Sequence, residues 1–161
     1  MNLTHLHLLT NHIPVIGTAI GIFILLAGMF RKSLELQVAA YLIFVLSTFG
    51  VIISYFTGDS AAESVEYIYD VSERNIETHA NAARTTFFCM LVLAVLSLFA
   101  LLIANKKPER SGSVAQLILL VAAVSIGLAA YTSNLGGKIR HTEIDQKQNQ
   151  PQEDELNEIY E

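Results

Sequence analysis

Histidine is the residue type in this chain best suited to metal or redox chemistry, and the sequence contains five of them. An imidazole nitrogen binds iron, copper or zinc, and its other nitrogen needs a hydrogen-bond partner that fixes the tautomer. Three histidines lie in polar strings beside apolar runs, namely His12, His79 and His141. The glutamates that could orient an imidazole or bind a metal themselves are Glu63, Glu66, Glu77 and Glu143.

Two kinds of site fit these residues, and the sequence leaves both open. In the first, His12 and His79 bind the iron of a b-type haem from opposite sides, and His141 is a third candidate ligand or a propionate partner. Covalent c-type haem is excluded because the chain has no CxxCH motif. In the second, the same histidines bind iron, copper or zinc together with the glutamates. The other residues placed at a haem pocket are Tyr55, Tyr131 and Arg140.

The elements that would position these side chains are four long apolar runs. They cover residues 13–30, 34–56, 85–104 and 114–131. Each is long enough to cross a hydrocarbon core of about 30 Å as a helix, and Glu35 is the only charged residue in them. Hydrophobic residues make up 52% of the chain and charged residues only 16%, so much of its surface must face lipid. The prediction is an all-α integral membrane protein, folded as a four-helix up-down bundle.

The short connections predict how the chain crosses the membrane. Arg31 and Lys32 join the first two runs, and residues 105–112, which join the last two, contain three more basic residues. Because cytoplasmic loops are enriched in Lys and Arg, both turns are predicted inside and both termini outside a bacterial inner membrane. His5 and His7 lie in an uncharged lead-in and are expected to rest in the membrane interface. All five histidines then share the outer face.

Polar segments complete the predicted domain. Residues 59–72 place acidic side chains on one helical face and predict a short interfacial helix. Gly136 and Gly137 are expected to end the fourth helix and let the chain turn back over the bundle. The polar, acidic tail over 145–161 is predicted to be disordered, which leaves residues 1–144 as one transmembrane domain.

A weak internal duplication relates the two predicted hairpins. Each half begins with a histidine, His12 or His79, and returns to a tyrosine, Tyr55 or Tyr131, that precedes a hydroxyl residue and a glycine. In an up-down bundle the first and third helices are diagonal, about 13–14 Å apart when neighbours are about 9–10 Å apart. Two helices whose imidazoles bind one haem iron from opposite sides need about that separation between their axes.

Four strings of the sequence carry a family resemblance. They are residues 9–14 (LTNHIP), residues 55–66 (YFTG followed by AE and VE), residues 76–80 (IETHA) and residues 136–141 (GGKIRH). Together they resemble the bacterial membrane family known as domain-of-unknown-function family 2231, over about residues 5–144. The resemblance implies a four-helix membrane fold and, because family members are often fused to or encoded beside cytochrome c modules, a redox setting. The chain departs from the family at Ala80, where family members tend to carry glutamate.

The expected function is that of a membrane redox subunit that transfers electrons through haem. The alternatives are a non-haem metal-binding membrane protein and an accessory subunit without chemistry. We expect the chain not to be an enzyme by itself, because it has no nucleophile elbow, phosphate-binding glycine loop or HExxH motif. Its net charge of −5 argues against nucleic acid as a partner. The expected partners are the lipid bilayer and a cytochrome or other respiratory-chain protein, and whether the chain forms an oligomer is left open.

Overall fold

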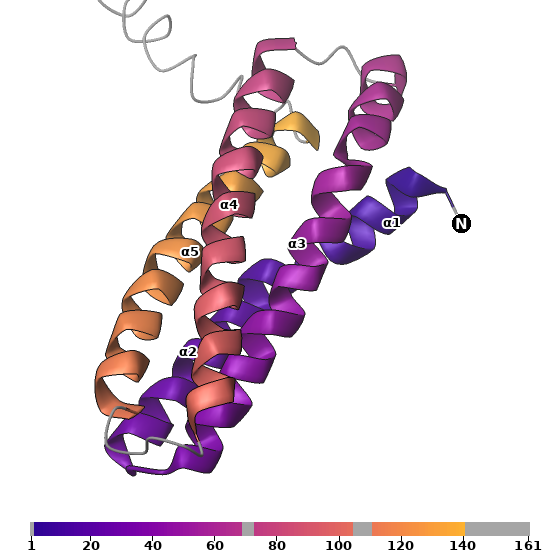
Figure 1. Ribbon diagram of the computed structural model, residues 1–161. Coiled ribbons are helices and arrows are strands. Elements are labelled where there is room, and N and C mark those ends of the chain that lie inside the picture. The colour runs from indigo at the N-terminus through magenta and orange to yellow at the C-terminus, as the bar shows by residue number, and fades with distance from the viewer. Residues whose placement is uncertain (1, 69–72, 105–110, 141–161) are drawn as a thin grey trace, which may run out of the picture.

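The chain is almost entirely helical where the computed structural model describes it, which is over residues 2–68, 73–104 and 111–140. These ranges contain no strand. The helices in order are α1 Leu3–Thr10, α2 Ile13–Phe30, α3 Leu34–Ile68, α4 Glu73–Ala104 and α5 Ser111–Arg140 (Figure 1). Four stretches are long and apolar enough to cross a membrane, counting α1 and α2 as one stretch. This is the architecture of a multi-pass membrane protein, as the sequence predicts.

The first span begins with a helix that the sequence analysis did not predict. α1 is capped by Asn2, whose side chain accepts a hydrogen bond of 3.3 Å from the Thr4 N–H. The helix is interrupted at Asn11 and His12, and α2 then begins with Pro14 in its first turn. Proline is well suited to this position because it has no N–H to leave unpaired. The bounds of α2 agree with the predicted run over 13–30.

α3 is longer than the predicted second span. It continues through Gly58 to Ile68, so the segment expected to form a separate interfacial helix is the last part of α3. A helix that has already formed extends at little cost when no proline interrupts it. Residues 69–72 of the expected helix, and the acidic tail over 145–161, lie outside the described residues.

α5 also extends beyond its predicted end. It runs through Gly136 and Gly137 to Arg140, so the prediction that this glycine pair ends the helix is wrong. No glycine in the described part of the chain has a positive φ, the conformation that a terminating glycine commonly adopts. α4 likewise begins at Glu73, well before the predicted start at residue 85.

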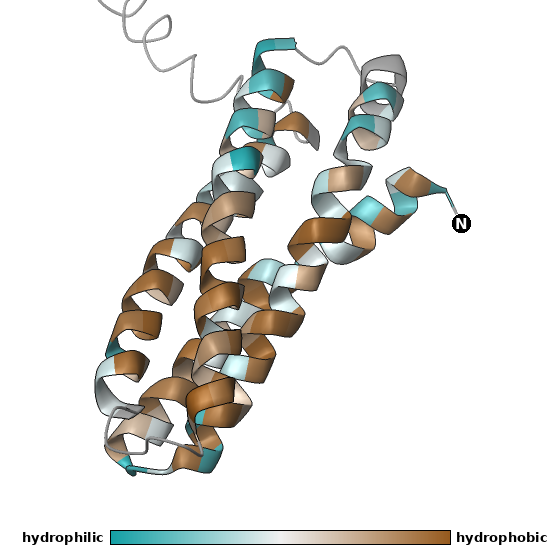
Figure 2. Cartoon of the chain, viewed as in Figure 1, coloured by the Kyte–Doolittle hydropathy of each residue, from teal (hydrophilic) through white to brown (hydrophobic). Residues whose placement is uncertain are grey.

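The four long helices pack in a ring. α2 packs against α3, α3 against α4, α4 against α5, and α5 against α2, while α1 packs against α3 (Figure 1). α2 and α4 therefore occupy diagonal corners, as expected for an up-down bundle. The turn over residues 31–33 closes one end of the bundle, and the opposite end is formed by α1 and the polar ends of the other helices (Figure 2).

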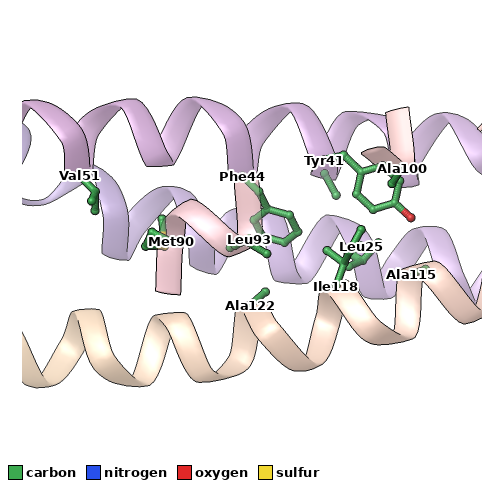
Figure 3. Close-up of a cluster of buried hydrophobic side chains, with 11 residues drawn as sticks. Leu25, Tyr41, Phe44, Val51, Met90, Leu93, Ala100, Ala115, Ile118 and Ala122 are labelled. Atoms are coloured by element: carbon green, nitrogen blue, oxygen red, sulfur yellow. The ribbon is translucent and has the colours of Figure 1, made fainter. Parts of the chain in front are cut away.

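The core lies in the middle of the bundle and is small. Leu25, Phe44, Met90, Leu93 and Ile118 are fully buried and point toward one another from four helices (Figure 3). Large apolar residues elsewhere face outward: Phe23 is 73% exposed, Phe30 85% and Leu102 72%. This distribution suits a lipid environment, where helices associate through small residues rather than by hiding large apolar ones.

Gly21 tests how tightly α2 and α3 pack. A Cβ atom at this position would overlap the ring of Phe44, which is fully buried and has no free space in which to move. We expect Gly21→Ala to lower the free energy of unfolding in detergent by about 1–3 kcal/mol, the usual cost of overpacking. Gly127→Ala is the matched control, since nothing lies within 4 Å of that position. Equal stability of the two variants would contradict the close α2–α3 contact.

Candidate functional site

Two histidines are partly buried at the end of the bundle opposite the 31–33 turn, and they lie on different helices. His7 is on α1 and His79 is on α4, and both are half-buried. His79 was a predicted ligand, whereas His7 was expected only to rest in the interface. The local surroundings of the two rings are similar enough to be compared atom by atom.

His79 packs directly on α5. Its Nδ1 is 3.0 Å from the backbone oxygen of Thr132. One turn further along α5 lies Gly136, where a Cβ atom would be only 3.1 Å from Cε1 of the ring. The hydroxyls of Thr86 and Thr132 are 2.8 Å apart and join the same two helices. Glycine is therefore needed at position 136 for the close approach of the imidazole and not, as expected, to end the helix.

His7 packs on α3 in the corresponding way. Its Nδ1 is 2.9 Å from the backbone oxygen of Ser54 and 3.4 Å from the Thr57 hydroxyl. Gly58 lies one turn after Ser54, and a Cβ atom there would be 3.9 Å from Cε1 of the ring. The hydroxyls of Thr10 and Ser54 are 2.8 Å apart. His7 was expected only to rest in the membrane interface, and in the structure its ring makes a defined contact with α3.

These contacts determine the tautomer of each ring. A backbone carbonyl only accepts, so Nδ1 of His7 and of His79 must carry hydrogen and donate it. In a neutral imidazole the lone pair available for a ligand is then on Nε2. No hydrogen bond of the described residues engages Nε2 of either ring.

The other predicted site residues are more dispersed. His12 precedes α2, is exposed, and makes no side-chain capping bond. Tyr131 is 56% exposed. Glu63 and Glu77 are exposed on α3 and α4. The side chains of Glu66 and Arg140, and the whole of His141 and Glu143, lie outside the described residues.

Tyr55, the remaining predicted residue, belongs to an aromatic cluster between α3 and α4. Its ring stacks on Phe87 with a centroid distance of 4.4 Å and an interplanar angle of 23°. Phe56 and Phe88 extend this cluster with edge-on contacts. Tyr55 follows Ser54 and Phe87 follows Thr86 in sequence, so the cluster lies at the level of the two histidine contacts.

The number of candidate ligands restricts the metal chemistry of this end. Within 2–68, 73–104 and 111–140, no three His, Cys, Asp or Glu side chains gather closely enough to hold a metal ion.

One further polar atom is notable: Oδ1 of Asn11 is buried and has no hydrogen-bond partner in the described part of the chain. Asn11 follows His7 by one helical turn and donates its backbone N–H to the His7 carbonyl at 3.0 Å. Leaving such an oxygen unpaired costs about 1–3 kcal/mol, which favours a donor or ligand beside it.

The predicted duplication and the structure relate the two halves through different residues. The predicted duplication aligned His12 with His79 and Tyr55 with Tyr131. In the structure the equivalent contacts are made by His7 and His79. A signal for this register is present in the sequence, since a hydroxyl residue precedes glycine by four positions in both Ser54–Gly58 and Thr132–Gly136.

Comparisons of the chain with protein-family models, with curated proteins and with solved structures find no match.

The tautomers provide a direct test of this geometry. We expect ¹⁵N NMR of the imidazoles at mildly alkaline pH to show His7 and His79 in the Nδ1–H form, because both donate to carbonyls. Gly136→Ala should shift the imidazole resonances of His79, because its ring must move by a few tenths of an ångström. Gly137→Ala is the control, because nothing lies within 4 Å of that glycine. An Nε2–H signal from His79 in the unmodified protein would contradict the Thr132 contact.

Proposed function

We propose that this chain is a membrane redox protein that holds a b-type haem between imidazoles at the end of the bundle opposite the 31–33 turn. The proposal rests on the hydrogen bonds of the two half-buried rings, His7 and His79. Their Nδ1 atoms donate to backbone carbonyls, and their Nε2 atoms make no hydrogen bond within the described residues and could bind a metal. Ligand histidines in proteins commonly have this arrangement, because the second-shell acceptor fixes the ring and raises its basicity.

The donor set fits haem better than it fits a bare metal. Haem iron receives four nitrogens from the porphyrin and needs only two axial ligands from the protein. Structural zinc and non-haem iron take three or more protein ligands, which the described residues do not provide. The bound haem would supply one-electron chemistry. The chain's own residues orient the imidazoles, and the aromatic cluster around Tyr55 and Phe87 offers apolar surface beside them.

The second candidate is a non-haem metal site made from the same rings. Two imidazoles without a third ligand suit Cu(I) among the transition metals, because it accepts few ligands, whereas iron or zinc would need carboxylates such as Glu63, Glu66, Glu77 or Glu143 in addition. The third candidate is an accessory role without chemistry. The haem proposal ranks first because His7 and His79 are oriented in the same way and no carboxylate accompanies them in the described residues.

The setting of the proposal is a bacterial inner membrane, with both termini and the histidines at the outer face. Arg31 and Lys32 support this orientation, because basic turns remain in the cytoplasm. The outer end then carries 13 of the 15 acidic residues and would face a cytochrome or other respiratory-chain partner. The resemblance to domain-of-unknown-function family 2231 points to the same redox setting and stays a prediction.

Absorption spectra test the cofactor. We expect the protein, purified from haem-sufficient cells in mild detergent, to show a Soret band and, when reduced, a sharp α-band. His79→Ala should lower the amount of bound haem, because it removes both one donor and the bond to the Thr132 carbonyl. His5→Ala is the control, since His5 is exposed and outside the site. A haem-free preparation that carries copper near one equivalent, lost in His79→Ala, would favour the second candidate instead.

Cysteine labelling tests the orientation. We expect an impermeant maleimide to label Asn81→Cys in intact cells and Ser33→Cys only after lysis, with Cys89→Ser as the common background. Asn81 is exposed on the polar part of α4, and Ser33 lies in the basic turn. Serine suits position 89 because the Cys89 thiol is 3.3 Å from the Ser125 hydroxyl. The reverse labelling pattern would place the histidines in the cytoplasm.

A further inference from the structure

We infer that His7 would bind the haem iron together with His79, and that the chain positions these two imidazoles by using one local arrangement twice. The inference rests on the proposed haem function and names the ligand pair. It differs from the expectation based on sequence, which paired His12 with His79.

The arrangement has three parts that recur in both halves. A half-buried imidazole donates from Nδ1 to the backbone oxygen of a hydroxyl residue, Ser54 for His7 and Thr132 for His79. Four residues after that hydroxyl residue comes a glycine, Gly58 or Gly136, that lies beside Cε1 of the ring. A Cβ atom would be 3.9 Å from Cε1 at Gly58, which is an ordinary contact, and 3.1 Å from Cε1 at Gly136, which is a tight one. Since four residues make about one helical turn, the carbonyl and the glycine lie on the same helix face.

A pair of hydroxyls completes the arrangement in each half. Thr10 donates to the Leu6 carbonyl at 2.9 Å and lies 2.8 Å from the Ser54 hydroxyl, which must therefore donate to it. In the other half Thr86 donates to the Ala82 carbonyl at 3.0 Å and lies 2.8 Å from the Thr132 hydroxyl. Each pair fixes the helix that carries the imidazole against the helix that supplies the carbonyl. The two rings are thus held by matching bonds although one helix has 8 residues and the other 32.

The packing order places the two histidine contacts on neighbouring pairs of helices. α1 packs on α3, α5 packs on α4, and α3 and α4 are neighbours in the ring of helices. His12 has none of these features: it is exposed and follows the break between α1 and α2. Of the histidines in the described residues, His7 therefore matches His79 and His12 does not.

α1 carries His7 on a segment joined to the bundle by polar contacts. Thr4, His7 and Thr10 recur every third residue and bond to α3, with the Thr4 hydroxyl 2.8 Å from the Ser64 hydroxyl. Leu3, Leu8 and Leu9 face away from the protein and are 50%, 43% and 57% exposed. The polar face of α1 thus faces the protein, while its leucines face the membrane.

The test uses a variant that separates the ligand from the local fold. In His7→Asn the side-chain amide nitrogen occupies the place of Nδ1, so the bond to the Ser54 carbonyl is kept while Nε2 is lost. The ferric haem protein should show the low-spin spectrum of two imidazole ligands by electron paramagnetic resonance. His7→Asn and His79→Asn should each convert it to a high-spin form with one ligand, and added imidazole should restore the low-spin spectrum.

The controls distinguish failure of this inference from failure of the proposed function. His12→Asn should leave the low-spin spectrum unchanged. A low-spin signal that survives in His7→Asn, or that is lost in His12→Asn, would overturn the inference while leaving the haem function intact. Wild-type protein that binds haem only in a high-spin form would do the same. Wild-type protein that takes up no haem under haem-sufficient expression would overturn the proposed function itself.

Discussion

The constraint on which this structure depends is that a polar group in a membrane must find its partner inside the protein. Bilayer hydrocarbon provides no hydrogen bonds, so every buried hydroxyl or imidazole needs an acceptor on a helix. The buried hydroxyls largely satisfy this need locally by donating to the carbonyl one turn earlier, as Thr48 does to Phe44, Thr57 to Ile53 and Ser125 to Val121. The two half-buried histidines satisfy it across helices, through the carbonyls of Ser54 and Thr132. The same bond that satisfies a half-buried imidazole fixes hydrogen on Nδ1 and leaves the lone pair on Nε2.

The packing of the bundle follows from the same environment. Because lipid is as apolar as leucine, burying large side chains contributes little, and close contact between small residues holds the helices together. Gly21 accommodates Phe44 in the core, and Gly136 accommodates His79 at the polar end. The glycines therefore have one role in both places, which is to let a ring from a neighbouring helix approach the backbone. At Gly136 that role creates the site, whereas at Gly21 it secures the bundle that positions the site.

Much of the fold could be predicted, and about half of the candidate site. The four apolar stretches, the basic turn at residues 31–33 and the diagonal placement of α2 and α4 follow from length, composition and chain direction. His79 was predicted as a site residue because it lies in a polar string before an apolar run, and in the structure its ring contacts α5. The polar extensions of α3, α4 and α5 were underestimated, since hydropathy detects what lies in the hydrocarbon and not where a helix ends. α1 and His7 were missed because the lead-in is too short for a periodic pattern to stand out.

The sequence by itself determined that this chain crosses a membrane as helices and that its histidines fall near one end. Both conclusions depend on how many apolar residues lie between polar ones, and this information is local to each segment. Only the tertiary structure showed which histidines contact a neighbouring helix, because that depends on the register between helices far apart in the chain. A shift of one turn exchanges the residue that meets a carbonyl and a glycine for one that meets lipid or water. His7 and His12 are five residues apart, and the contact of α1 with α3 buries the first and leaves the second exposed.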